Sequence, residues 1–460
     1  MGKHHPYVRR TWVYGLAGLT SLTSVVADAG GFALIEQSVS SMGTAYANGS
    51  AGIDDSSTIF FNPASMTLLA GQNATGGVHI IRSDVEFSGN GFYNPDNPAI
   101  QASGLAGAPI QGKNSDDLGV TAALPHGAYS HQYNDQIWFG LTVNGPFGLK
   151  TEYSDNWVGR YNAIKSELTT VNINPSFAYK INERASVGFG VSALYADGEL
   201  TQAVDGGLGA ALLGIPIPWV PGSNTFDGNA KLTGDDWGYG YNLGVLFEPT
   251  DKTRLGIAYR SKVDLKIEGD VEVSGLPPPL NVSNGTQNAK LDLSLPDSLS
   301  ISGLQQLTPQ WAIMADVTRT NWSKLDSLDI QIEDGSRSVT QLQWDDTMRY
   351  SLGATYKYSE SWLFRTGVAY DETPTPDAQL RTARIPDENR TWLALGANYK
   401  FNKKLTFDLG YAHLFVDDPK IDSSDAYDPT TGLNTGFHKV KGNYDASVDI
   451  LSAQVNWRFN

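Results

Sequence analysis

The stretch from Arg254 to Glu268 reads RLGIAYRSKVDLKIE, and apolar and polar side chains alternate along it. The odd-numbered positions are apolar: Leu255, Ile257, Tyr259, Val263, Leu265 and Ile267. The even-numbered positions are mostly small or charged: Arg254, Gly256, Ala258, Arg260, Lys262, Asp264, Lys266 and Glu268. Successive side chains of a β-strand point to opposite faces, so this stretch predicts a strand with one apolar and one polar face.

Similar alternation recurs along the whole chain after about residue 70. We count fourteen such segments: 71–88, 118–130, 135–149, 165–180, 185–200, 233–248, 253–274, 287–304, 310–332, 339–358, 361–373, 389–401, 405–417 and 443–459. Connections after even-numbered segments are short, and most of those after odd-numbered segments are long. This asymmetry is typical of bacterial outer-membrane barrels. The predicted fold is therefore all-β, a 14-stranded antiparallel transmembrane β-barrel.

A secreted β-sandwich is the alternative, because its strands also alternate. Aromatic residues at segment ends favour the barrel, where they would form girdles at the membrane surfaces. These are Trp237, Trp311, Trp362, Tyr356, Tyr358, Tyr399, Phe401, Trp457 and Phe459. The net charge of -16 argues against a nucleic-acid partner, and the absence of Cys excludes disulfides and thiolate metal sites.

The first 29 residues resemble an export signal. Lys3, Arg9 and Arg10 precede an uncharged run, and Ala27-Asp28-Ala29 has the small-x-small pattern of a cleavage site. The run is shorter than the ~20 residues of a membrane-spanning helix, which disfavours an anchor. We predict a signal peptide over 1–29, an N-terminal hatch over 30–70 and the barrel over 71–460.

Residues 30–70 do not alternate, yet they carry many apolar side chains. The barrel lumen is the natural place to bury them, so this segment is predicted to plug the pore. Phe60 and Phe61, followed by Asn62, Pro63 and Ala64, are the candidate gating residues.

Short motifs in collinear order resemble the FadL/TodX type of outer-membrane transporter for long-chain fatty acids and aromatic hydrocarbons. They are Gly31-Phe32-Ala33-Leu34, Ser41 to Tyr46, Asn62-Pro63-Ala64, Phe147-Gly148-Leu149, Trp157 to Tyr161, Ile173-Asn174-Pro175, Tyr259-Arg260-Ser261, Leu295-Pro296-Asp297, Phe364 to Gly367, Tyr370-Asp371, Ile385-Pro386-Asp387, Arg390 and Trp392. The resemblance implies a fourteen-stranded barrel closed by an N-terminal hatch, in agreement with the strand count.

The third predicted strand contains Gly145, Pro146, Phe147 and Gly148 near its end. Proline cannot donate a ladder hydrogen bond and glycines permit a kink, so the wall is expected to open here, unless the strand simply ends. Family members have an inward kink in this strand, and the resemblance implies a lateral exit from lumen to bilayer.

The loop over 201–232 is unusually apolar for an extracellular loop. Its candidate capture residues are Leu208, Leu212, Leu213, Ile215, Ile217 and Trp219, and the stretch from Ser274 to Leu280 is the candidate second wall of a groove. An exposed apolar patch of this kind normally binds something, although a helix packed on neighbouring loops is the alternative. The resemblance implies that the groove captures hydrophobic cargo.

Ionic residues on the predicted lumenal face form another candidate set: Arg254, Arg260, Lys262, Asp264, Arg349, Arg365, Asp371 and Arg390. Mutual pairing that stiffens the barrel is the simplest interpretation, and a binding role for one or two is the alternative. Fatty acid transporters place basic residues just after the fifth strand, whereas this chain has Asp197 and Glu199 there. That departure favours an uncharged cargo.

No motif indicates catalysis, a metal site or a cofactor. The histidines lack metal-ligand spacing, and the acidic loop over 417–428 does not match a calcium loop. The predicted function is a passive outer-membrane channel for hydrophobic molecules in a Gram-negative cell. The expected partners are a hydrophobic small molecule, outer-membrane lipid and lipopolysaccharide, and the chain is expected to be a monomer. The alternative is a general diffusion porin for small polar solutes.

Overall fold

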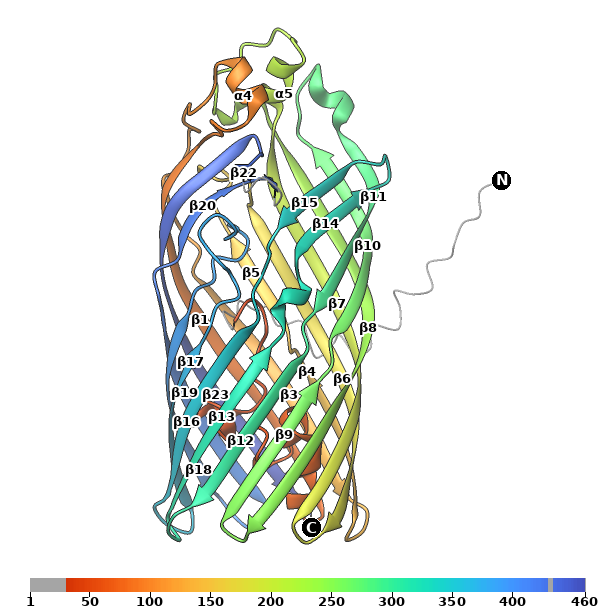
Figure 1. Cartoon of the computed structure of the whole chain (residues 1–460), viewed down its shortest axis with the longest axis vertical. Coiled ribbons are helices and arrows are strands. Elements are labelled where there is room, and N and C mark those ends of the chain that lie inside the picture. Colours follow the sequence, from red (N-terminus) through yellow and green to blue (C-terminus); the bar gives the residue numbers. More distant parts are fainter. Residues whose placement is uncertain (1–29, 429–432, 460) are drawn as a thin grey trace, which may run out of the picture.

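The computed structural model describes residues 30–428 and 433–459, so the predicted signal peptide lies outside the described residues. Fourteen antiparallel wall strands in these ranges form a closed barrel (Figure 1). The barrel closes because β1 (Gln72–Tyr93) pairs with β23 (His438–Arg458) over the whole length of both strands. The predicted fold class and strand number are confirmed.

Seven wall strands are continuous and seven are broken into two pieces. The continuous strands are β1, β6 (Lys165–Asn182), β7 (Ala185–Asp205), β8 (Asp227–Thr250), β17 (Trp362–Asp371), β18 (Arg390–Lys400) and β23. The broken strands are β2 (Ser115–Asp117) with β3 (Val120–Gln132), β4 (Ile137–Asn144) with β5 (Gly148–Glu152), β9 (Thr253–Arg260) with β10 (Val263–Ser274), β11 (Gly285–Leu295) with β12 (Ser298–Gln306), β13 (Trp311–Thr320) with β14 (Ser327–Ile332), β15 (Arg337–Gln341) with β16 (Thr347–Lys357), and β19 (Leu405–Val416) with β20 (Lys420–Ser424). A further short pair is formed by β21 (Tyr427–Asp428) and β22 (Leu433–Asn434).

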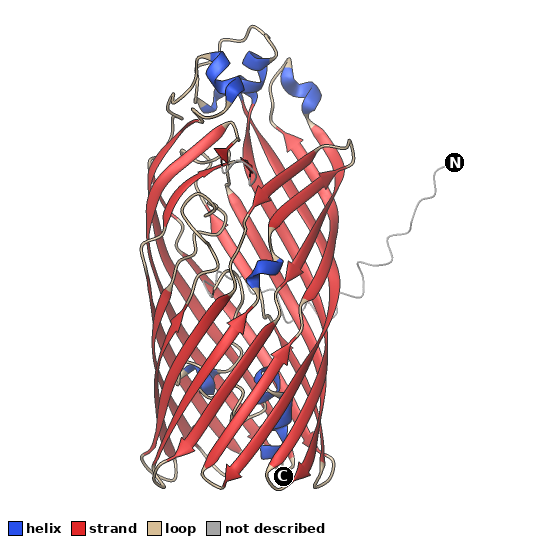
Figure 2. Cartoon of the chain, in the orientation of Figure 1, coloured by secondary structure: helices blue, strands red, loops and turns tan. Residues whose placement is uncertain are grey.

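The helices are short and lie in three places (Figure 2). Inside the lower half of the barrel, the N-terminal segment forms α2 (Val39–Met42), α3 (Thr58–Phe61) and the 3-10 turn η1 (Pro63–Leu68). The upper rim carries α4 (Pro98–Ser103), α5 (Gly206–Leu212), η2 (Asn224–Phe226) and η3 (Leu280–Ser283), while η4 (Trp322–Lys324) interrupts the wall. Among the described residues, no helix is long and apolar enough to cross a membrane.

The lower part of the wall presents apolar side chains outward. On β7, Val187, Phe189 and Val191 are exposed, whereas the intervening Gly188 and Gly190 are buried on the lumenal side. Exposed aromatic side chains such as Trp311 and Trp362 lie next to the short turns. This belt is the surface that a bilayer would cover.

The stretch from Arg254 to Glu268 is not one continuous strand. β9 ends at Arg260 and β10 begins at Val263, and the side-chain alternation shifts by one residue between them. Leu255 and Ile257 therefore face outward, whereas Val263, Leu265 and Ile267 are buried inside the barrel. Bulge-like breaks of this kind re-aim side chains.

This shift corrects the predicted lumenal position of Lys262 and Asp264. Both are exposed on the outer surface, where they form an ion pair of 2.8 Å. The reason is that β10 continues above the apolar belt, where the outer surface is polar and the interior is a packed apolar cluster. Periodicity shows that a strand has an apolar and a polar face, but it does not show which of the two faces the lumen.

Candidate functional site

The wall is open at the break between β4 and β5. β3 pairs with β4 only from Gly127 to Gln132, and β5 pairs only with β6. The upper part of β3 and β5 therefore have no ladder with each other. The structure places Gly145, Pro146 and Phe147 in this gap, directly before the first residue of β5.

The N-terminal segment covers the gap from inside. The Leu34 N–H donates to the Pro146 carbonyl (2.8 Å), and the Gly148 N–H donates to the Phe32 carbonyl (3.0 Å). The Gln37 amide donates to the Gly145 carbonyl (2.8 Å). Residues 32–34 thus act as a short strand that occupies part of the missing ladder.

Asn62 anchors the N-terminal segment to the opposite wall. Its side chain caps η1 by accepting from the Ala64 N–H (3.0 Å) and donates to the Ser50 and Val245 carbonyls (2.6 and 3.0 Å). Two wall glycines make room for this turn: a Cβ at Gly244 would lie 1.9 Å from the Asn62 side chain, and one at Gly188 would lie 2.3 Å from the Ala64 nitrogen. The predicted Asn62-Pro63-Ala64 motif is therefore a tight contact between this segment and the barrel.

A cavity with about 1090 Å³ of empty space, part of it open to solvent, lies between the N-terminal segment and the wall. One side is apolar, and it is formed by Ala33, Leu34, Ile35, Phe60, Phe61, Pro146 and Phe147. The other side is rich in hydroxyl groups and charges, and it includes Ser298, Ser300, Asp316, Thr318, Thr320, Thr347, Arg260, Arg349 and Asp371. The cavity reaches the break in the third wall strand, so an apolar chain inside it would lie next to the lateral gap.

Arg260 is a cavity residue suited to bind an anion. Its guanidinium donates to the Phe60 carbonyl (2.6 Å) and lies 4.3 Å from the centre of the Phe60 ring. Among the described residues, no carboxylate oxygen lies within 4.0 Å of it, and the side chain is half-buried. A half-buried cation without a carboxylate partner has lost part of its hydration, so a bound anion would stabilise it.

The other predicted lumenal ions serve mainly to hold the structure together. Arg365 pairs with Asp408 (2.6 Å), and Arg254 reaches Asp54 (3.5 Å). Arg349 donates to the Ala45 carbonyl (3.2 Å) and lies 5.1 Å from the centre of the Trp392 ring.

Arg390 pairs with Asp387 (3.1 Å), whose carboxylate also accepts the Gly31 N–H (2.9 Å), and lies 4.0 Å from Asp371. Asp387 belongs to the loop after β17, which folds into the lumen. Ala383 of the same loop accepts a hydrogen bond at its carbonyl from the hydroxyl of Tyr153, the residue after β5 (2.8 Å). The sequence analysis missed this inward fold, and the only signal for it is the apolar Ile385 within a polar loop.

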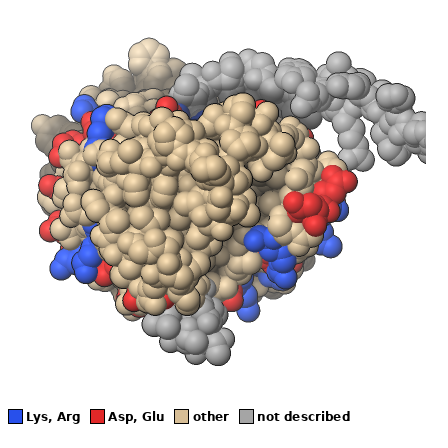
Figure 3. All heavy atoms as spheres, turned by 90° about the horizontal axis from the view of Figure 1, so that it is seen from above, with Lys and Arg blue, Asp and Glu red and all other residues tan. Residues whose placement is uncertain are grey.

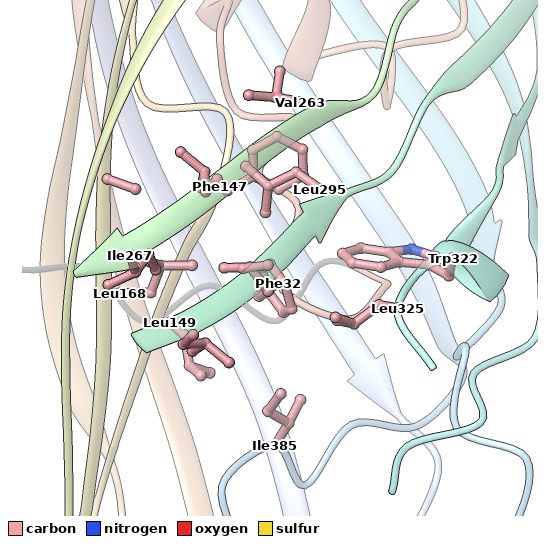
Figure 4. Packing of buried hydrophobic residues seen from close by; sticks show 14 of the residues in the cluster. Phe32, Phe147, Leu149, Leu168, Val263, Ile267, Leu295, Trp322, Leu325 and Ile385 are labelled. Atoms are coloured by element: carbon pink, nitrogen blue, oxygen red, sulfur yellow. The ribbon is translucent and has the colours of Figure 1, made fainter. Parts of the chain in front are cut away.

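An apolar cluster lies above the cavity. Figure 4 shows Phe32 among Phe147, Leu295, Trp322 and Leu325. The Phe32 ring makes edge contacts with Trp322 (5.0 Å) and Phe147 (6.2 Å). The N-terminal segment therefore contributes both to the cavity and to the packing that covers it.

The short helices α4, α5, η2 and η3 and the loops that join them form a largely uncharged layer on the upper rim, which we call the crown. The predicted capture loop is part of this crown. Leu208 is buried beneath α4, Leu212 and Leu213 are exposed, and Ile215, Ile217 and Trp219 are half-buried. Leu276 and Leu280 pack against Ala210 of α5, so the stretch after β10 does lie beside this loop. Seen from above, most of the crown surface lacks charged side chains (Figure 3).

His438 holds the base of this crown. It lies at the upper end of β23, above the apolar belt, and its ring nitrogens donate to Asp205 (3.2 Å) and Asp425 (3.0 Å). Burial alone would lower the pKa of His438, but the two carboxylates outweigh burial and raise the pKa to about 9. Asp205 also caps α5 by accepting from the Leu208 N–H (2.7 Å). A charged His438 therefore links α5, through Asp205, to β23 of the barrel.

The acidic residues after the fifth strand do not approach the cavity. Asp197 is exposed, and Glu199 pairs with Lys165 (3.1 Å) and Lys231 (2.9 Å) on the outer surface. These residues therefore give no reason to exclude an anionic cargo. Within the described ranges, no group of three or more His, Cys, Asp or Glu side chains is arranged to hold a metal ion.

The comparisons with known proteins identify this architecture. The family model for outer membrane protein transport proteins (OMPP1/FadL/TodX) matches residues 20–459. The chain belongs to the FadL/TodX family. It is an outer-membrane transport protein of a Gram-negative cell and not an enzyme.

Relatives are found both by sequence and by structure. A long-chain fatty acid transport protein of Escherichia coli O6:H1 is 34% identical over 418 residues, covering 87% of this chain and 90% of the relative. A Pseudomonas aeruginosa FadL homologue of known structure has a TM-score of 0.80 at 25% identity, covering 94% of this chain and all of that one. The Pseudomonas putida toluene transporter TodX shares the fold, with a TM-score of 0.62 at 18% identity, covering 89% of this chain and 95% of that one.

Proposed function

We propose that this protein carries long-chain fatty acids and similar single-chain amphiphiles across the outer membrane without an energy source. The observation that carries the proposal is Arg260, which faces a largely apolar cavity with no carboxylate partner among the described residues. The fatty acid transport function of the Escherichia coli relative supports it.

The proposed path has three steps. The exposed Leu212 and Leu213 on the crown capture the apolar chain, the cavity beside Phe60 and Phe61 holds it, and it leaves through the gap at Pro146. The N-terminal segment over 30–70 acts as the hatch, because residues 32–34 cover that gap. A general porin needs an open aqueous lumen, whereas this lumen contains the N-terminal segment and an apolar cluster.

Uncharged hydrocarbons are a second candidate cargo. The apolar side of the cavity, with Phe60, Phe61 and Phe147, provides contacts that need no charge. The name of the toluene transporter TodX, which shares the fold, gives this candidate a precedent.

We also propose that the protein works as a monomer surrounded by lipid and lipopolysaccharide. Apolar residues are exposed around the barrel, for instance Phe177, Leu243, Ile313, Leu395 and Leu451 on five different strands. A bilayer covers such a belt without a second copy.

The test of the cargo is the pair Arg260→Gln and Arg260→Lys. A hydrogen bond to a charged group contributes about 1.5–3 kcal/mol, so Arg260→Gln should weaken binding of a long-chain fatty acid by about 10- to 100-fold. Arg260→Lys keeps the charge and should lose less, and toluene uptake should be unchanged in both variants. Fatty acid affinity equal to wild type in Arg260→Gln would refute the carboxylate contact.

A further inference from the structure

Three neighbouring wall strands are broken at one height, beginning four wall strands along the barrel from the break at Pro146. Pro146 and Ser261 line one small pocket between the two breaks. The breaks are Ser261-Lys262 between β9 and β10, Pro296-Asp297 between β11 and β12, and residues 321–326 between β13 and β14. Figure 1 shows η4 in the last of these breaks, at the front of the barrel.

The hydrogen-bond ladder is missing along the first of these breaks. β8 pairs with β9 up to Asn242↔Arg260 and pairs with β10 only from Asp235↔Glu268. The gap is bridged by the Tyr241 N–H, which donates to the Ser261 hydroxyl (2.8 Å), by the Ser261 N–H, which donates to the Tyr241 carbonyl (2.8 Å), and by the Lys266 N–H, which donates to the Asp236 carboxylate (2.7 Å). Two of these three contacts use a side chain in place of a backbone group.

The next breaks are bridged in a similar way. The Asn321 N–H donates to the Asp297 carbonyl (3.0 Å), and the Asn321 amide donates to the Asp297 carboxylate (2.7 Å). Contacts that depend on side chains can separate without unzipping the strands below, because those strands keep their own ladders.

The wall between the cavity and the outer surface is one residue thick at these breaks. Arg260, Pro296 and Trp322 line the cavity. Their neighbours Ser261, Asp297 and Asn321 line a groove of about 830 Å³ on the other side of the wall, and Tyr259 lines both.

The groove lies at the upper edge of the apolar belt. Tyr239 and Tyr241 are exposed there, above the lipid-facing Leu243, while Lys262 and Asp264 lie at its upper side. Lys324 also lines the groove, and among the described residues no carboxylate oxygen lies within 4.0 Å of its ammonium group. Aromatic side chains and an unpaired cation suit an amphiphile whose anionic head lies at the membrane surface.

We propose that the breaks in the β9–β10, β11–β12 and β13–β14 strands form a second lateral opening, through which a single-chain anionic amphiphile passes between the cavity and the outer leaflet. Its head group would exchange Arg260 on the inside for Lys324 on the outside, while its chain passes between β8 and β10, in the stretch above Tyr241 that has no ladder. The proposal rests on the proposed function, since it needs an amphiphile in the cavity.

The first test closes the opening with a disulfide. The chain has no Cys, and a Cβ at Gly240 would lie 2.9 Å from the Ser261 hydroxyl, so Gly240→Cys with Ser261→Cys brings two thiols into contact. The oxidised double variant should take up a long-chain fatty acid at half the rate of the reduced form or less, and reductant should restore uptake. The single variants are controls that should not respond to reductant.

Equal uptake by the oxidised and reduced forms would overturn the second opening. Wild-type protein measured in the same cells separates this from a failure of the proposed function: if wild type restores no fatty acid uptake, the proposed function is wrong. If wild type restores uptake and the disulfide has no effect, only the second opening is wrong.

A second test compares two buried serines by their reactivity. Ser261→Cys lies in the break, whereas Ser452→Cys is buried on β23, whose ladders with β1 and β19 are intact there. A hydrophilic maleimide added from outside should label Ser261→Cys at least tenfold faster, and a long-chain fatty acid should slow the labelling. Equal rates for the two cysteines would contradict an opening at this place.

Discussion

Individual side chains hold the N-terminal segment and the crown to the barrel wall. Asn62 joins the N-terminal segment to β8 through the Val245 carbonyl, and His438 joins the crown to the barrel through Asp205 and Asp425. The sequence singled out Asn62 because it stands in a recognisable motif. His438 gave no such signal, because one of its carboxylate partners, Asp205 at the end of β7, is 233 residues away in the sequence.

The His438 contact predicts a crown that loosens in alkali. The folded-state pKa of about 9 is above the ordinary value of 6.5, so the contribution to stability is full below pH 6.5 and is lost as the pH rises through 9. This contribution is on the order of 3 kcal/mol. Spin labels on Leu213→Cys and Val282→Cys should give a narrow distance distribution at pH 7 and a broad one at pH 10.

His438→Gln is the control for that measurement. It should give a broad distribution at both pH values, since a neutral amide cannot replace the charged ring. A wild-type distribution that stays narrow at pH 10 would show that His438 does not hold the crown.

At the scale of elements, seven of the fourteen wall strands are broken, and both proposed openings lie at such breaks. Alternation in the sequence predicted all fourteen wall strands, because each piece of a broken strand still alternates by itself. It did not predict that the apolar face points outward in β9 and inward in β10. Apolar residues occupy the odd-numbered positions on both sides of Ser261, so the sequence pattern itself does not change there. Pro146 was singled out as a break, and Pro296 was not, although the same argument applies to both.

The proposed exit at Pro146 predicts that restoring its N–H reduces transport. Pro146→Thr supplies the missing donor and a residue that favours extended structure, so uptake of a hydrophobic cargo should fall several-fold at normal outer-membrane abundance. Gly148 should be left unchanged, because a Cβ there would lie 2.9 Å from the Leu34 side chain and would displace the N-terminal segment. Uptake by cells is the measurement.

Pro175→Thr is the matched control. Pro175 lies in β6, opposite Leu141 of β4, and the β4–β6 ladder continues on both sides of it. Its replacement should leave uptake unchanged. If Pro146→Thr also transports normally in an assembled barrel, cargo does not leave at that gap.

At the scale of the whole molecule, the barrel and the N-terminal segment depend on each other. Lumen-facing glycines such as Gly188 and Gly244 leave room that the segment fills, and wall side chains accept from its backbone, as Gln454 does from the Val39 N–H (3.0 Å) and Ser302 from the Ser50 N–H (2.9 Å). The apolar, non-alternating sequence of residues 30–70 predicted a plug in the lumen and the resemblance implied a hatch, but neither predicted which wall residues the segment contacts.

Deleting residues 30–70 should make the channel leaky. The lower lumen would lose the side chains that fill it, and a fourteen-stranded barrel is wide enough to admit water and small solutes. Single-channel conductance in planar bilayers should rise, with the full chain as control. An unchanged conductance would show that this segment does not block the pore.

The central claim is that an anionic amphiphile lies in the cavity with its head at Arg260 and its chain beside Phe60 and Phe61. A crystal structure with a fatty acid brominated at the end of its chain tests this directly, because the bromine can be located by anomalous scattering. The account predicts bromine within the apolar side of the cavity and the carboxylate in contact with Arg260. Bromine found only in the crown, or a carboxylate bound away from Arg260, would contradict it.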